Sequence, residues 1–265
     1  MQPLLNIGVR AARRAGDLIV RSLAKLDSLK VDSKGRNDFV TDVDRKAEAD
    51  IIATIRRSYP GHAVLGEESG RTGDSEYLWI VDPLDGTTNF LHGFPQFSVS
   101  IALRHKNRLE CAVIYDPMRQ ELFTADRGGG AQLDGKRIRV SSQRTLEGSL
   151  IGTGFPYRMD PAHVDPYLAM LKAVMATAAG VRRPGSASLD LAYVAAGRTD
   201  GFWEFNLQPW DTAAGVLLIR EAGGRVGTPS GGDYELGPNV VAGNPKVYAG
   251  LLELIGPLTP EALRA

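Results

Sequence analysis

The chain of 265 residues carries 31 Lys and Arg against 31 Asp and Glu, so its formal net charge is zero. This balance excludes a general basic field for nucleic acid or anionic membranes, and we expect no strong intrinsic nucleic-acid binding. The length suits one large domain or two fused lobes. A single cysteine, Cys111, excludes an internal disulfide and a multi-cysteine metal site.

The first residues predict a mature helix rather than a targeting segment. Apolar residues recur every three or four positions from Leu4 to Leu23, and charged residues interrupt them, which leaves no core for a signal peptide. The sequence has no apolar run of about 18 residues, the length that a membrane span requires. We therefore expect a cytoplasmic protein that does not enter the membrane.

A second helix is expected after the polar stretch at residues 32–38. Thr41 and Asp44 have the spacing of a capping box, and apolar residues at helical spacing follow. Pro60 and Gly61 end the pattern.

The middle of the chain changes to the alternation that is typical of strands. Residues 97–103 and 109–115 predict a hairpin that turns at Asn107 and Arg108. Further strands are expected at residues 121–125 and 131–140, the latter folded back at Asp134 and Gly135.

Beyond Thr145 the pattern mixes helices and short strands. Helices are expected at residues 161–179, 188–196, 211–222 and 245–255, and strands near Leu150, Phe202 and Val240. The change of pattern predicts two lobes, residues 1–147 and 148–265.

The most informative residues are carboxylates at the ends of apolar segments. Residues 77–81 form an apolar run suited to a buried strand, which delivers Asp82 and Asp85 at its end. A proline and a glycine favour a tight turn there, so both carboxylates and the carbonyl of Leu84 could bind one or two hard divalent cations. A surface turn is the alternative, because Asp-Gly is a common turn dipeptide.

Two further acids have the same placement. A short apolar strand over 63–66 ends at Glu67, and Asp211 stands at a predicted helix start. Taken singly, Glu67 is also explained as a solvated strand end and Asp211 as a helix N-cap. Four such acids in one partly buried site would repel one another, and a cation would remove the repulsion. The ligand set favours magnesium, which binds few carboxylates and keeps positions for water and phosphate oxygens.

A phosphate site is predicted directly after these aspartates. Gly86, Thr87 and Thr88 could open a short helix whose free amides point at a phosphate. Metal ions and amides would then flank one phosphate, which predicts hydrolysis by water attack.

These segments resemble the metal-binding motifs of the inositol monophosphatase family, lithium-sensitive phosphatases. The matching segments occur in the family's order and separation, at residues 66–69, 79–90 and 210–215. Residues 116–119, 189–198 and 242–245 look like the bacterial SuhB-type branch. The resemblance implies an α/β fold, an alternating α/β/α/β/α layered sandwich with two sub-lobes, and a homodimer.

The resemblance also implies a role for each matching residue. Up to three Mg²⁺ ions would be bound by Glu67, Asp82, Asp85, Asp211 and the carbonyl of Leu84. The catalytic residues would be Asp44, Thr87 and Glu67, with Asp44 paired to the Thr87 hydroxyl to activate the attacking water. From the residues alone, Asp44 is more simply a capping residue. Substrate contacts would come from Lys34, Gly86, Thr87, Gly185, Ser186, Ala187, Glu204 and Asp211.

The implied reaction is hydrolysis of inositol-1-phosphate and related phosphates to an alcohol and phosphate. The SuhB-type branch further implies a regulator that joins RNA polymerase and antitermination factors. Three alternatives stay open. Asp42 to Asp44 resembles the nucleophile motif of haloacid-dehalogenase-type phosphatases, although the segment before it is too polar for the strand that such a motif follows. The substrate could be fructose 1,6-bisphosphate or 3′-phosphoadenosine 5′-phosphate, or the protein could be mainly a non-enzymatic regulatory partner.

Overall fold

The computed structural model describes residues 3–26, 31–35, 38–155 and 160–264. Helices α1 (Pro3–Leu23) and α2 (Asp42–Ser58) lie against one face of a large sheet. The capping box expected for the second helix is confirmed: the Thr41 side chain accepts from the amides of Val43 and Asp44, and the Asp44 carboxylate accepts from the Thr41 amide. These hydrogen bonds fix the position at which α2 begins.

Within the described residues, the large sheet has eight strands in the order β10-β9-β8-β7-β6-β5-β3-β4. The strands are β3 (Ala63–Gly66), β4 (Gly70–Thr72), β5 (Tyr77–Asp85), β6 (Ser98–His105), β7 (Arg108–Asp116), β8 (Glu121–Asp126), β9 (Gly130–Leu133) and β10 (Lys136–Arg137). β5 runs parallel to β3 and antiparallel to β6. The ends of β5 and β3 therefore lie at the same edge of the sheet.

The expected hairpins form, with two corrections. The β6–β7 turn is made by Lys106 and Asn107, which have φ of 47° and 64°, whereas Arg108 already pairs with His105. Positive φ at both central residues is the geometry of a tight two-residue hairpin. The strand expected over 131–140 turns at Asp134 as predicted but ends at Arg137.

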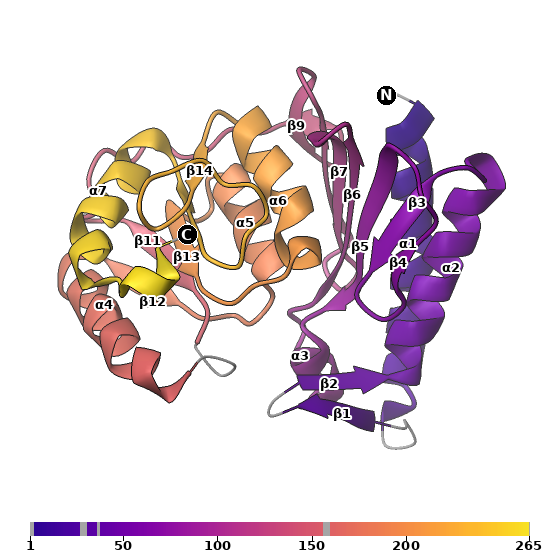
Figure 1. Ribbon diagram of the computed structural model, residues 1–265, viewed down its shortest axis with the longest axis horizontal. Helices are drawn as coiled ribbons and strands as arrows, with labels where there is room; N and C mark the ends of the chain where they lie inside the picture. Colours follow the sequence, from indigo (N-terminus) through magenta and orange to yellow (C-terminus); the bar gives the residue numbers. More distant parts are fainter. Residues whose placement is uncertain (1–2, 27–30, 36–37, 156–159, 265) are drawn as a thin grey trace.

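A second sheet, again counted over the described residues, has five strands in the order β12-β11-β13-β15-β14. Its strands are β11 (Leu150–Thr153), β12 (Gly180–Arg182), β13 (Gly201–Glu204), β14 (Arg225–Gly227) and β15 (Val240–Gly243). Helices α5 (Ala187–Ala195) and α6 (Pro209–Glu221) lie between the sheets, and α4 (Val164–Thr177) and α7 (Pro245–Ile255) cover the outer face (Figure 1). The fold is the α/β/α/β/α layered sandwich that the resemblance implied.

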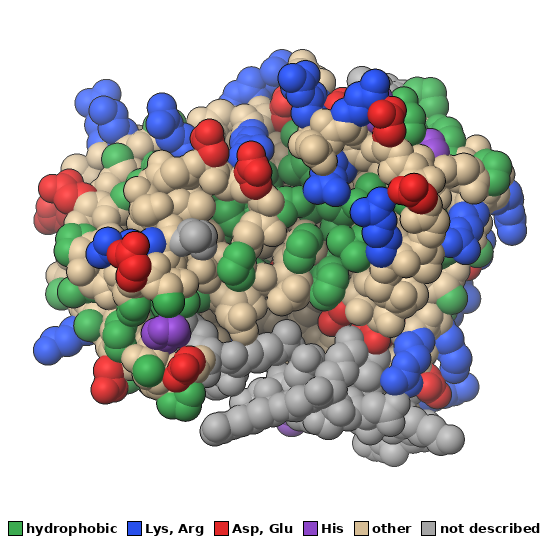
Figure 2. Space-filling view, viewed as in Figure 1, with side chains coloured by type: hydrophobic (Ala, Val, Ile, Leu, Met, Phe, Trp, Pro, Cys, Tyr) green, Lys and Arg blue, Asp and Glu red, His purple; other side chains and the backbone are tan. Residues whose placement is uncertain are grey.

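The charged surface is mixed, as the balanced composition suggests. In the view of Figure 1, side chains of both signs are scattered over both halves of the molecule (Figure 2). No helix in the described part of the chain combines the length and apolarity needed to cross a membrane.

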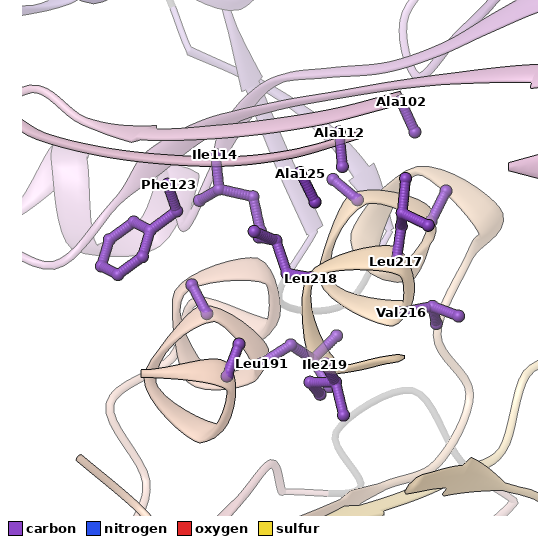
Figure 3. Packing of buried hydrophobic residues seen from close by; sticks show 14 of the residues in the cluster. Ala102, Ala112, Ile114, Phe123, Ala125, Leu191, Val216, Leu217, Leu218 and Ile219 are labelled. Atoms are coloured by element: carbon purple, nitrogen blue, oxygen red, sulfur yellow. The ribbon is translucent and has the colours of Figure 1, made fainter. Parts of the chain in front are cut away.

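The apolar core between the two sheets joins residues from both halves of the chain. Ile114 and Phe123 of the large sheet, Leu191 of α5 and Phe202 of β13 belong to one buried cluster. Figure 3 shows Leu218 of α6 directed toward Ile114. The boundary expected at residue 147 falls between the last strand of the first sheet and the first strand of the second, while this cluster spans both sides of it.

The polar stretch at residues 32–38 contributes strands that its composition did not indicate. β1 (Val31–Gly35) and β2 (Asp38–Thr41) pair antiparallel, and β2 leads directly into α2. The short helix α3 (Thr87–Leu91) lies beside this hairpin (Figure 1). The start of α2 and the start of α3 thus meet below the end of β5.

Candidate active site

Strand β5 carries two aspartates at its C-terminal end. Its ladder with β6 is interrupted between them. Asp82 pairs with Ser100 and Asp85 with Ser98, and the register shifts in between. Pro83 lies in this interval and has no amide hydrogen to donate to the ladder. Asp82 is buried, and its Oδ1 accepts a hydrogen bond from the Leu84 amide at 3.0 Å.

Four carboxylates repel one another at this end of the sheet. Burial raises the pKa of Asp82 well above its ordinary value, and the charges of Glu67, Asp85 and Asp211 raise it further. Glu67 follows β3 and reaches this place because its amide donates to the Val81 carbonyl at 3.2 Å. Asp211 comes from the first turn of α6. The sequence-predicted acids are therefore near neighbours, although they belong to three separate segments.

Asp85 is held by the start of α5. Its Oδ2 accepts hydrogen bonds from Ser186 Oγ at 2.6 Å, from the Ser188 amide at 2.8 Å and from the Ser188 hydroxyl. Burial raises its pKa, and the bonds from the two serines and from the Ala187 amide oppose that rise. Ser186 and Ala187, expected on the substrate side, thus lie at the carboxylate of Asp85, whereas Gly185 lies against Asn89.

Thr87 and Asp44 are in direct contact. Thr87 Oγ1 lies 2.9 Å from Asp44 Oδ1 and 3.1 Å from the Leu84 carbonyl oxygen. Asp44 is fully buried, and burial raises its pKa while hydrogen bonds from Thr41 and Thr87 oppose the rise. Its second oxygen accepts from Thr41. The Asp44 carboxylate can therefore cap α2 with one oxygen and contact Thr87 with the other.

Gly86 and Asn89 bring α3 close to the segment before α5. Gly86 has φ of 95°, and a Cβ on it would lie 2.9 Å from the Gln96 carbonyl and 3.3 Å from that of Gly185. Only glycine fits there. Asn89 Nδ2 is within 2.7 Å of the Gln96 carbonyl, 2.9 Å of that of Pro184 and 3.2 Å of that of Gly185.

The remaining predicted residues have the following places. Asp211 is not the N-cap of α6, which is Gln208; it is the third residue of the helix and accepts from the Gln208 amide at 2.7 Å. Glu204, at the end of β13, is half-buried against Gly154, where a Cβ would fall 1.8 Å from its Oε1. Lys34 belongs to β1, and its side chain is outside the described residues.

Asp190 is a site residue that the sequence reasoning missed. It is buried in α5, and its pKa is raised well above the ordinary value by burial and by the charges of Glu204 and Asp85, with Arg183 opposing. No residue in the described ranges donates a hydrogen bond to its carboxylate. The available signal was a lone acid in the apolar stretch 189–196.

Glu48 was missed as well. It is buried on α2 one turn after Asp44, and its carboxylate accepts from the amides of Glu68 and Ser69, each at 2.8 Å. These bonds fix the turn that follows Glu67. Its position on the apolar face of α2 was the sequence signal, since a charge there needs a buried partner.

The donor set fits a hard divalent cation in its chemistry. All candidate ligands are oxygens, and a cation would neutralise the repulsion that raises the pKa of Asp82. As the side chains stand, no three Asp, Glu, His or Cys residues in the described part of the chain converge on one metal position. One oxygen each of Asp82, Asp85 and Asp211 accepts a hydrogen bond from the protein.

The layered α/β fold, with carboxylates beside a Thr-Asp pair at the end of β5, is one that comparison with known proteins assigns to a family of phosphatases. The chain belongs to the inositol monophosphatase family, whose model matches residues 1–258. It is 54% identical over 270 residues to the Nus factor SuhB of Pseudomonas aeruginosa, covering 100% of both chains.

Solved structures agree with this membership. The extragenic suppressor protein SuhB of Bartonella henselae superposes with a TM-score of 0.92 at 47% identity, covering 96% of this chain and 98% of that one. An inositol monophosphatase from Anabaena superposes with a TM-score of 0.85 at 38% identity and 97% coverage of each chain.

Proposed function

We propose that this protein is a Mg²⁺-dependent phosphomonoesterase that hydrolyses inositol-1-phosphate and related phosphates. The observation that carries the proposal is the hydrogen bond from Thr87 to Asp44 beside four mutually repelling carboxylates. A hydroxyl that donates to a buried carboxylate can accept a proton from water on its other side. The family membership supports the reaction class.

The residues divide into a cation set and a water-activating pair. Up to three Mg²⁺ ions would be held by Glu67, Asp82, Asp85, Asp211 and the Leu84 carbonyl. When bound, the ions polarise the phosphate and lower the pKa of water. Thr87 takes a proton from the attacking water while it passes its own proton to Asp44. Glu67, a member of the cation set, is the third catalytic residue. The water oxygen bonds to phosphorus, the bond from phosphorus to the alcohol oxygen breaks, and the leaving alkoxide takes a proton from a solvent water. Asp44 then returns its proton to solvent.

The substrate's two ends face different elements. We assign the phosphate to Lys34 and the amides of Gly86 and Thr87 at the start of α3, and the polyol to Glu204, Asp211 and residues 185–187. Carboxylate oxygens suit a polyol because they accept hydrogen bonds from hydroxyl groups. Glu204 is half-buried and within electrostatic range of Asp190, which places two such acceptors in one region.

The test is phosphate release from inositol-1-phosphate, fructose 1,6-bisphosphate and 3′-phosphoadenosine 5′-phosphate, with and without Mg²⁺ and lithium. We expect complete Mg²⁺ dependence, inhibition by lithium and the highest kcat/KM on inositol-1-phosphate. A higher kcat/KM on either bisphosphate would reassign the substrate. Trapping of an aspartyl-phosphate that the Asp42→Asn variant cannot form would replace the mechanism.

A second candidate function rests on the relatives named Nus factor SuhB. Under this proposal a cytoplasmic homodimer binds RNA polymerase and antitermination factors. The Asp85→Asn variant separates the two functions, because it alters the cation set without changing the surface. Loss of hydrolysis with unchanged co-purification of RNA polymerase supports partner binding as an independent task. Failure of the wild-type chain to co-purify would contradict it.

A further inference from the structure

A pocket of about 710 Å³ opens between the end of the β6–β7 hairpin and the C-terminal half of α6. Residues 233–236 complete its wall, and Leu109, Val216 and Leu217 supply apolar surface. The volume is in the range of pockets that hold small organic molecules. None of its lining residues belongs to the candidate active site.

Two of the pocket's arginines have unused binding capacity. The side chains of Arg104 and Arg108 form no ion pair or hydrogen bond with any residue of the described part of the chain. In contrast, Arg127 pairs with Glu110 at 3.1 Å, and Arg220 donates to the Tyr234 carbonyl at 3.0 Å. A guanidinium group presents several donors in a plane that matches carboxylate and phosphate oxygens.

The carboxylates of the pocket form no ion pair with these two arginines in the described chain. Glu221 accepts from the amides of Gly128 and Gly130, each at 2.8 Å. Asp233 and Glu235 stand on the wall made by residues 233–236, and no ion pair in the described residues joins them to Arg104 or Arg108. Figure 2 shows hydrophobic side chains exposed between the two halves of the molecule, with Lys, Arg, Asp and Glu side chains above them.

The pocket is remote from the carboxylates of the candidate active site. In the β5–β6 register Asp82 pairs with Ser100, whereas Arg104 pairs with Leu78, four residues away. At a strand rise of about 3.3 Å per residue these positions are about 13 Å apart. Asp211 is in the first turn of α6 and Arg220 in its last, about 14 Å along the helix axis.

We propose that this pocket is a second ligand site, which binds a small organic anion bearing phosphate or carboxylate groups through Arg104 and Arg108. The apolar residues of α6 contact the ligand's carbon skeleton, and the two guanidinium groups hold its charge. The proposal does not depend on which phosphate the catalytic site hydrolyses.

The test is calorimetric titration of the full-length chain, freed of divalent metal and dialysed into chelator-free buffer because EDTA is itself a polycarboxylate, with pyrophosphate and citrate as probes. Without metal, the carboxylates of the candidate active site repel anions, so the binding heat reports the pocket. We expect saturable binding of at least one probe and a loss of at least tenfold in affinity in the Arg104→Gln/Arg108→Gln double variant. The control is Arg57→Gln, an exposed arginine of α2 that is also unpaired within the described chain. The tighter probe identifies phosphate or carboxylate as the preferred group.

Three outcomes would overturn the proposal. The first is the absence of saturable binding at millimolar probe, and the second is a double variant that binds the probe like the wild type. The third is an equal loss of affinity in Arg57→Gln, which would mean general electrostatic attraction. Amide chemical shifts of the wild-type chain give an independent reading should the double variant fold poorly. Changes on addition of the probe should fall at residues 104–109 and 216–221; changes confined to residues 86–88 would place the anion in the active site instead.

Discussion

The hydroxyl of Thr87 donates to Oδ1 of Asp44 across 2.9 Å, although 43 positions separate the two residues in the chain. Because Asp44 also caps α2, its orientation is fixed before any substrate arrives. The pair therefore links a helix start to the chemistry proposed at the end of β5.

Removing this hydroxyl should lower kcat far more than it raises KM. Thr87→Val keeps the side-chain shape but cannot relay a proton, and we expect a loss of about a hundredfold or more in kcat. Thr87→Ser should retain most activity. The control is Thr88→Val, since Thr88 is the exposed neighbour in α3. Steady-state kinetics at saturating Mg²⁺ measures all three, and a wild-type kcat in Thr87→Val would contradict the relay.

Asp82→Asn should remove a pH-dependent loss of stability and, at the same time, abolish most of the activity. The raised pKa of Asp82 means that the folded state binds a proton more tightly than the unfolded chain. In EDTA the free energy of unfolding should therefore fall as the pH rises through the raised pKa, and the variant should lack this fall. Hydrolysis should decrease by orders of magnitude, because a cation ligand is lost.

Urea unfolding in EDTA between pH 4 and pH 8 measures the stability difference. Asp74→Asn, at a fully exposed position, is the control and should follow the wild type. If Asp82→Asn and the wild type show the same pH dependence, Asp82 is not the group whose raised pKa lowers the free energy of unfolding.

Glu48→Gln tests a positioning role. A glutamine offers one carbonyl oxygen, so one of the amides of Glu68 and Ser69 loses its acceptor and the turn after Glu67 loosens. We expect the Mg²⁺ concentration for half-maximal activity to rise by about tenfold, with kcat at saturating Mg²⁺ nearly unchanged. Glu253→Gln, exposed on α7, is the matched control. A fall in kcat at unchanged Mg²⁺ requirement would contradict a role through Glu67.

We expect His62 to make the sheet sensitive to acid. Its Nδ1 accepts from Trp79 Nε1 at 3.1 Å, and its ring stacks between Tyr59 and Tyr77. Burial lowers the pKa of His62, and the charge of the neighbouring His105 lowers it further. His105 in turn lies 3.8 Å from Glu76. Protonated His62 could not accept the Trp79 bond, which would leave the donor of a fully buried indole unpaired.

Because the folded state resists protonation of His62, stability should fall as the pH drops below about 6.5, the ordinary histidine value. The loss continues until the lower pKa of the folded state is reached. Urea titration from pH 7.5 to 5 should show a smaller decline in His62→Gln than in the wild type. The exposed residue His92 provides the control, His92→Gln. Equal declines in all three proteins would disprove this account.

The parts of the fold that local pattern determines could be read from the sequence. The Thr41 cap, the helices and the acids at the end of β5 depend on spacings of a few residues. The strand at residues 31–35 could not be read, because a polar hairpin lacks the alternation of a half-buried strand. Short edge strands such as β4 and β12 give too few residues for any period to emerge.

The contacts of the site were harder to predict, for a different reason. Glu48 bonds to amides 20 and 21 residues away, and Asp85 to serines 101 and 103 residues away. Local pattern carries no information on such pairs. The residue pattern and the family resemblance both indicated ligand candidates, whereas the groups that hold those ligands became apparent only from the packed chain.

The dependence of Asp85 on Ser186 and Ser188 bears on the order of events during synthesis. The aspartate leaves the ribosome about a hundred residues before the hydroxyls that surround it. A nascent or truncated chain that ends before α5 carries a clustered negative charge with no donors around it. The proposed hydrolytic activity should therefore arise late in synthesis, only after the second half of the chain has docked.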